Sequence, residues 1–172
     1  DMDYTFNPYE GDQVAALNTD FNNGNNNDWL ISPQVEGLNG NQRLRYRYRV
    51  QSTGEPNDFE VKLSTTGIAP ADFTTTLVPL ASYSNTTYVE NVVLLTGVTG
   101  TVNVAFHVPN GGLDGWRLYI DKVIIENNPT CIEPTSPTVV NTTATSATLQ
   151  WTDNNTPPAT QWEVLVLPAG SA

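Results

Sequence analysis

The sequence contains few of the residues on which most catalytic and zinc-binding sites depend. Its 172 residues include one histidine, His107, and one cysteine, Cys131. A zinc site therefore lacks nitrogen and sulfur ligands. A Ser-His-Asp triad would have to include His107, which lies in a predicted strand, and the chain has no G-x-S-x-G turn. Two of the 18 acidic residues could converge as in a glycosidase, but nothing singles out a pair. We therefore expect a protein that binds and does not catalyse.

Basic residues and long apolar runs are also scarce. Lys and Arg total 7 against 18 Asp and Glu, which gives a formal net charge of -11 and a pI of about 4.1. Nucleic acids and anionic membranes bind basic surfaces, so this balance argues against both as partners. No run approaches the roughly 18 apolar residues of a membrane span. No signal peptide is visible at Asp1, so we expect a mature or trimmed product.

Helical periodicity is absent, and alternation of apolar and polar residues takes its place. The clearest case is 43–50, where four arginines share one strand face and Leu44, Tyr46, Tyr48 and Val50 share the other. Clusters of Gly, Asn and Pro separate further strand candidates at 29–32, 58–64, 88–94, 102–108 and 116–126. Residues 68–73 are a candidate for one helical turn. Short strands at this spacing predict an all-β, antiparallel jelly-roll sandwich over residues 1–128.

The pattern in the last quarter of the chain predicts the beginning of a second domain. Segments 137–140, 145–151 and 161–166 resemble the first three strands of a fibronectin type III module, an immunoglobulin-like sandwich. Such a module needs about seven strands and roughly a hundred residues. We therefore predict an incomplete fibronectin type III-like module at 129–172, after a linker at about 127–136. Three strands expose an apolar face and an unpaired edge, so residues 137–167 are expected to pack on the jelly roll or to self-associate.

Five motifs follow one another along the first domain: Asn27–Pro33, Phe59–Gly67, Asp72–Thr74, Val104–His107 and Leu118–Val123. In this order and spacing they resemble the cleaved-adhesin domain, a MAM-like jelly roll of surface and secreted proteins of Bacteroidetes. The resemblance covers roughly residues 10–126. It implies a secreted or cell-surface, non-catalytic adhesion module that binds a glycan or a host or matrix protein. The alternatives are an accessory domain of a secreted hydrolase, a protease or polysaccharide-degrading enzyme whose catalytic part lies elsewhere, and a spacer without a ligand.

An Asn-rich segment at 20–28 is a candidate calcium site. It places oxygen-bearing side chains at alternate positions, among them Asp20, Asn22 and Asp28. Calcium takes six to eight oxygen ligands, which a wrapped polar loop can supply, although the segment lacks the EF-hand pattern. The alternative is a hairpin loop whose Asn-Gly pair forms a turn. The resemblance adds Asp121 as a second candidate, because the family commonly has two consecutive aspartates where this chain has Asp121 and Lys122. Such an ion would be structural and would tie the first and last strands together.

Four arginines form a cationic row on this acidic chain, here called the arginine ladder: Arg43, Arg45, Arg47 and Arg49. Guanidinium groups bind carboxylates bidentately, so the ladder could bind an acidic glycan or a protein partner. The alternative, which we favour, is a solvated sheet face neutralised by cross-strand acids such as Glu60 or Glu90.

Aromatic rings are further candidates, because sugars stack on exposed rings. Trp116 follows a glycine-rich loop and is expected to be exposed, whereas Trp29 alternates within an apolar strand and is expected in the core. The predicted ligand-binding residues are Arg45, Arg47, Arg49 and Trp116.

Overall fold

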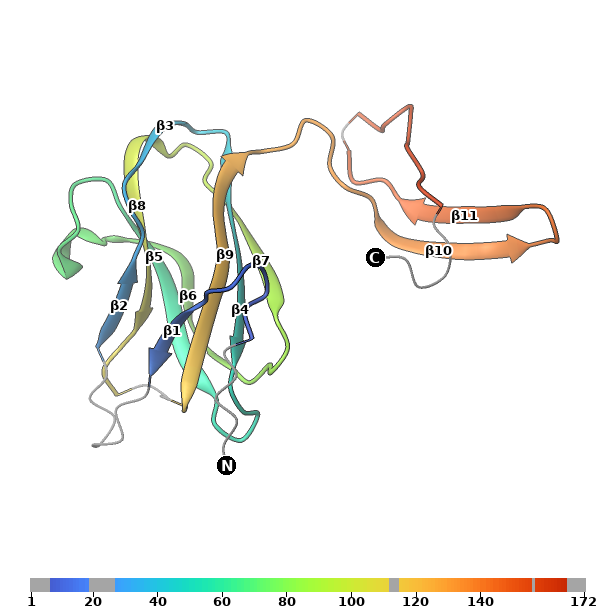
Figure 1. The fold of residues 1–172 in the computed structure, drawn as a ribbon. Helices are drawn as coiled ribbons and strands as arrows, with labels where there is room; N and C mark the ends of the chain where they lie inside the picture. The colour runs from blue at the N-terminus through green and yellow to red at the C-terminus, as the bar shows by residue number, and fades with distance from the viewer. Residues whose placement is uncertain (1–6, 19–26, 112–114, 156, 167–172) are drawn as a thin grey trace. The chain divides into compact units, whose positions relative to one another are not determined.

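The computed structural model describes residues 7–18, 27–111, 115–155 and 157–166. Its strands confirm the expected all-β, antiparallel architecture (Figure 1). The chain divides into two compact units, Asp1–Asn128 and Pro129–Ala172, and each is described by itself. The described residues include no helix long and apolar enough to cross a membrane.

The first unit is a sandwich of two antiparallel sheets. Sheet A has the strand order β1 (Ala15–Asn18), β9 (Arg117–Asn127), β4 (Gln42–Val50) and β7 (Val89–Leu94). Sheet B has the order β2 (Asp28–Ile31), β8 (Thr99–Val108), β5 (Asn57–Ser64) and β6 (Thr75–Tyr83), and β3 (Val35–Asn39) also pairs with β8. A single 3-10 turn, η1 (Pro70–Asp72), lies within the segment for which the sequence predicts one helical turn.

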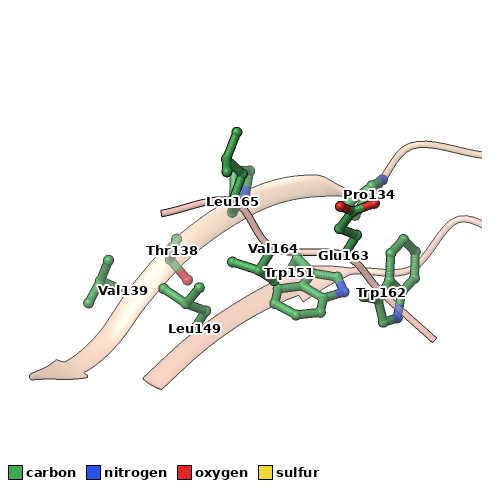
Figure 2. Close-up of a pocket in the computed structure, with 10 residues that line it drawn as sticks. Pro134, Thr138, Val139, Leu149, Trp151, Trp162, Glu163, Val164 and Leu165 are labelled. Atoms are coloured by element: carbon green, nitrogen blue, oxygen red, sulfur yellow. The ribbon is translucent and has the colours of Figure 1, made fainter. Parts of the chain in front are cut away.

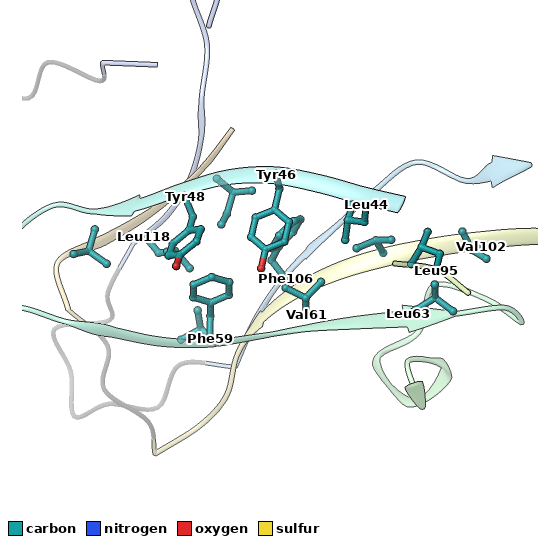
Figure 3. Packing of buried hydrophobic residues seen from close by; sticks show 14 of the residues in the cluster. Leu44, Tyr46, Tyr48, Phe59, Val61, Leu63, Leu95, Val102, Phe106 and Leu118 are labelled. Carbon is teal, nitrogen blue, oxygen red and sulfur yellow. The ribbon is translucent and has the colours of Figure 1, made fainter. Parts of the chain in front are cut away.

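The core of this unit lies between the two sheets (Figure 3). Leu44 and Val50 of β4 are completely buried, and Tyr46 and Tyr48 between them are at most 9% exposed. The Tyr48 ring meets the Phe59 ring edge-on at a centroid distance of 5.3 Å. Further core side chains come from β5, β8 and β9: Val61, Leu63, Val104, Phe106, Leu118 and Ile120. Because burying one such side chain stabilises the fold by about 1.5–3 kcal/mol, this cluster is the main source of stability.

Strand β6 has no counterpart in the sequence-based prediction. It carries Pro79 and no clean alternation, and most of its residues are exposed. Both features fit its place at the edge of sheet B, where a proline need not donate to a neighbouring strand. The pairing register with β5 shifts between Phe59 and Val61, opposite the stretch that contains Pro79, so the irregularity is accommodated there.

The second unit contains one described hairpin, β10 (Thr135–Thr142) paired with β11 (Ala147–Thr152). Two of the three predicted strands of the tail therefore form. The prediction of a third strand at 161–166 is wrong, because this segment has no strand pairing. It lies beside the hairpin instead, and the Trp162 ring meets the Trp151 ring edge-on at 5.7 Å. The fibronectin type III identity of this unit stays a prediction.

Two leucines on neighbouring strands of sheet A provide a matched test of the core. We expect Leu44→Ala to lower the free energy of unfolding by about 2–5 kcal/mol, because the leucine is fully buried and its removal leaves a cavity. Leu94→Ala should change it by less than about 0.5 kcal/mol, because Leu94 is 62% exposed. Urea unfolding measures the free energy of unfolding of both variants. Equal decreases for Leu44→Ala and Leu94→Ala would contradict the assigned orientation of sheet A.

Candidate functional site

The arginine ladder lies on the outer face of sheet A, as the alternation of β4 predicts. Each ladder arginine is half-buried, whereas the residues between them are buried. Strand β9 runs beside β4 and places Glu126 opposite Arg43, and Tyr119 opposite Arg49. Strand β7 lies on the other side and places Glu90 opposite Arg47. The two ends of the ladder therefore have different neighbours, one acidic and one aromatic.

At the acidic end, two glutamates form salt bridges to the ladder arginines. Arg43 forms a salt bridge to Glu126 at 2.7 Å, and Arg45 bridges Glu90 at 2.7 Å and Glu126 at 3.1 Å. Arg47 reaches Glu90 at 3.4 Å. Hydrogen bonds from Arg45 lower the pKa of Glu90, and those from Arg43 and Arg45 lower the pKa of Glu126. The favoured interpretation, a neutralised face, is therefore confirmed for this end with Glu90 as a partner.

The suggestion of Glu60 as a ladder partner is wrong. Glu60 lies on β5 in sheet B, where its Oε1 atom is 2.8 Å from Nδ1 of His107 and 3.4 Å from Nζ of Lys62. The sequence contains no signal that distinguishes the two sheets. Glu126, which takes the place of Glu60, comes from the far end of the chain's last strand in this unit.

At the aromatic end, three tyrosine rings surround the arginines; this set, Tyr9, Tyr88 and Tyr119, is here called the tyrosine cluster. The Arg49 guanidinium carbon lies 4.0 Å from the Tyr119 ring centroid and 5.2 Å from that of Tyr88. The Arg47 guanidinium carbon lies 4.0 Å from the Tyr9 ring centroid. Such contacts between a cation and a ring contribute about 0.5–1 kcal/mol each at exposed sites. They also fix the positions of the guanidinium groups.

A carboxylate holds the N-terminal segment against this end of the sheet. The backbone N–H of Tyr9 donates to Oδ2 of Asp121 at 2.6 Å, and the N–H of Lys122 donates to Oδ1 at 2.7 Å. Lys122 also forms a salt bridge to Glu10. The backbone at Lys122 has φ 47°, in the left-handed region, where the pairing of β9 with β4 changes register. Asp121 thus connects the beginning of the chain to β9.

Of the four predicted calcium ligands, the structure describes only Asp28 and Asp121, and these lie in different sheets. Asp20 and Asn22 lie outside the described residues. Asp28 lies on β2 in sheet B, on the same strand face as Leu30, which packs against the core. Asp121 lies in sheet A, and each of its oxygens already accepts a backbone N–H. The described residues contain no group of three or more His, Cys, Asp or Glu that could hold a metal ion. Asp121 therefore anchors the N-terminal segment, and its role as a calcium ligand stays a prediction.

Trp116 is 38% exposed, in agreement with the expectation from the sequence. It lies just before β9, next to Gly115, whose N–H donates to the Pro56 carbonyl oxygen at 2.9 Å. A Cβ atom at Gly115 would lie 2.0 Å from the backbone oxygen of Glu55, so this close approach requires glycine. Trp116 thus lies just before β9, close in sequence to Tyr119 and outside the ladder itself.

The prediction that Trp29 belongs to the core is wrong. Its ring stacks on His107 at a centroid distance of 3.8 Å, on the face of β8 opposite the core residue Phe106. His107 is 8% exposed, and its Nε2 atom lies 2.9 Å from Oδ1 of Asn27, which also accepts the Trp29 indole N–H. Both ring nitrogens of His107 are therefore engaged, Nδ1 by Glu60 of β5 and Nε2 by Asn27, the residue just before β2.

An apolar trough of about 320 Å³ lies on the hairpin of the second unit (Figure 2). Its lining includes Val139, Leu149, Trp151, Trp162 and Val164. A two-stranded hairpin is marginally stable by itself, and an apolar face on it is normally covered. Self-association through 137–167 stays a prediction.

The chain resembles one known family in sequence and in fold. A family model described as Cleaved Adhesin Domain matches residues 6–124. The K2 cleaved adhesin domain of Lys-gingipain aligns at 20% identity with a TM-score of 0.52, over 70% of this chain and 74% of that domain. The K3 domain of Lys-gingipain from Porphyromonas gingivalis W83 aligns at 20% identity with a TM-score of 0.51, over 67% and 72%.

The K1 domain from the same organism aligns at 21% identity with a TM-score of 0.47, over 61% of this chain and 66% of that domain. The K2 and K3 likenesses show the fold. The comparison with curated protein sequences gives no match.

The acidic end makes stability depend on pH. Because the folded-state pKa of Glu90 is lowered, its contribution is present above its ordinary pKa of about 4.3 and is lost as pH falls through the folded value. We expect Glu90→Gln to reduce stability by less than about 1 kcal/mol at pH 7, because the pair is partly exposed. In thermal unfolding from pH 7 to pH 3, this difference should shrink progressively once the pH falls below the ordinary pKa of glutamate. The exposed Glu36→Gln is the control, and a difference for Glu90→Gln that does not shrink between pH 7 and pH 3 would contradict the assignment.

Proposed function

Because the chain belongs to the cleaved adhesin domain family, we propose that it is an adhesion module of a larger secreted or surface-displayed protein. Its ligand is a glycan or an extracellular protein. The ligand-binding surface is the aromatic end of the arginine ladder, which consists of Arg47, Arg49, Tyr9 and Tyr88, while the buried ring of Tyr119 supports Arg49. The acidic end serves to stabilise sheet A.

The observation that carries this proposal is the contrast between the two ends of one sheet face. At the acidic end, the arginines are paired with glutamates of the same sheet. At the aromatic end, rings and cations lie side by side, and Tyr9 is 43% exposed. An exposed tyrosine next to arginine is typical of surfaces that bind partners, since both residue types are enriched at the energetic centres of interfaces.

A non-catalytic role is consistent with the chemistry of the described residues. The one histidine is engaged by Glu60 and Asn27, and Cys131 is exposed in the second unit. The second candidate function is an accessory domain of a secreted hydrolase. It is favoured by one observation: the matched K2 and K3 structures are domains of a larger protein, Lys-gingipain. Calcium as a structural ion stays a prediction for the segment that contains Asp20, Asn22 and Asp28.

The test is binding of the full chain to immobilised glycans and extracellular matrix proteins, in calcium and in EDTA. We expect at least one ligand whose binding is weakened about tenfold or more by Tyr9→Ala, a loss typical of a residue at the centre of an interface. The Tyr9 backbone N–H that anchors the segment to Asp121 remains in this variant. Lys62→Ala, on the outer face of sheet B, should bind normally. Absence of any ligand, or binding unaffected by Tyr9→Ala, would favour a spacer.

A further inference from the structure

One ladder arginine differs from the other three in its partners. Among the described residues, Arg43, Arg45 and Arg47 each have a carboxylate oxygen within 4.0 Å, and Arg49 has none. The carboxylate of Asp121, which comes from the same strand as Tyr119, is taken up by the N–H groups of Tyr9 and Lys122. Within the part of the chain that the structure describes, Arg49 is thus the ladder arginine without a carboxylate at salt-bridge distance, although the chain has 18 acidic residues and 7 basic ones.

The rings beside Arg49 fix its guanidinium without neutralising it. Tyr119 lies 4.0 Å from the guanidinium carbon, and Tyr88 accepts a hydrogen bond from Arg49. The Tyr88 hydroxyl in turn donates to the Asn7 carbonyl oxygen at 3.1 Å, so the ring is held in place. A guanidinium has five N–H donors in one plane. Stacking on Tyr119 occupies a face of this plane and the Tyr88 hydroxyl takes one N–H, so N–H groups remain at the edge for a planar, bidentate acceptor.

A fixed arginine loses less side-chain entropy on binding than a free one. The acceptor that matches its fork is a carboxylate, and the neighbouring Tyr9 ring, 43% exposed, provides an apolar surface for the C–H face of a sugar. Resting on the function proposed above, we infer that Arg49, together with Tyr88 and Tyr119, is a subsite for the carboxylate of an acidic glycan, such as a uronic acid residue.

The experiment titrates the full chain with an oligogalacturonate, with its methyl ester and with an oligoglutamate, while the arginine side-chain Nε–H signals are followed by NMR. The oligogalacturonate should shift the Arg49 signal, and the methyl ester, which lacks the charge, should not. Arg49→Gln should weaken binding of the oligogalacturonate at least tenfold, whereas Arg43→Gln, at the neutralised end, should change it less than twofold. Backbone amide spectra of both variants check that the fold is intact.

Three results would overturn the inference. Equal binding of the methyl ester would show that the carboxylate is not recognised. Binding of oligoglutamate alone would assign the subsite to an acidic peptide. Binding of none of the probes would leave Arg49 without this role. These results differ from a failure of the adhesion proposal. That proposal fails if no immobilised glycan or matrix protein shows binding that depends on Tyr9, whatever the three probes do.

Discussion

The strict alternation of β4 is the constraint on which both the core and the candidate site depend. A strand exposes successive side chains to opposite faces, so Leu44 and Val50 can be fully buried only if the ladder arginines lie outside. A slip of one residue would bury four guanidinium groups between the sheets, at a cost far above the stability of a domain. The hydrophobic core therefore fixes where the cations are presented, and it fixes their spacing.

The neighbouring strands β7 and β9 then determine which side chains contact each arginine. Glutamates on β7 and β9 neutralise Arg43 and Arg45, which stabilises the exposed sheet face. Farther along, β9 contributes Tyr119 opposite Arg49, and the N-terminal segment adds Tyr9 over Arg47. Asp121 makes this second arrangement possible, because it accepts the Tyr9 N–H across 112 residues of chain. The same carboxylate is thus engaged by two backbone N–H groups, and Tyr119 is the residue of β9 opposite Arg49.

The sequence predicts those features that local alternation controls, and the other features depend on tertiary contacts. The arginine face and the exposed Trp116 follow from local pattern, and the jelly-roll expectation follows from motif order. Trp29 was assigned to the wrong face because Trp29 and Leu30 are both apolar, and alternation cannot decide which of two adjacent apolar residues points inward. Glu126 as a ladder partner and Tyr9 as a ring neighbour depend on strand order and on a segment outside the sheet. No local pattern encodes either contact.

The four ladder arginines occupy equivalent alternate positions of β4, but glutamates contact Arg43 and Arg45 whereas tyrosine rings contact Arg49. Phenylglyoxal modification of the native chain, followed by mass spectrometry over time, measures this without a ligand. Arginine reacts through its neutral form, and the glutamates raise the pKa of Arg45, so this residue should be protected. We predict that Arg49 reacts before Arg43 and Arg45. We also predict that Glu90→Gln accelerates the reaction of Arg45 and Arg47, which both contact Glu90, and leaves Arg49 unchanged. Equal rates at Arg43, Arg45 and Arg49 would contradict this account of the ladder.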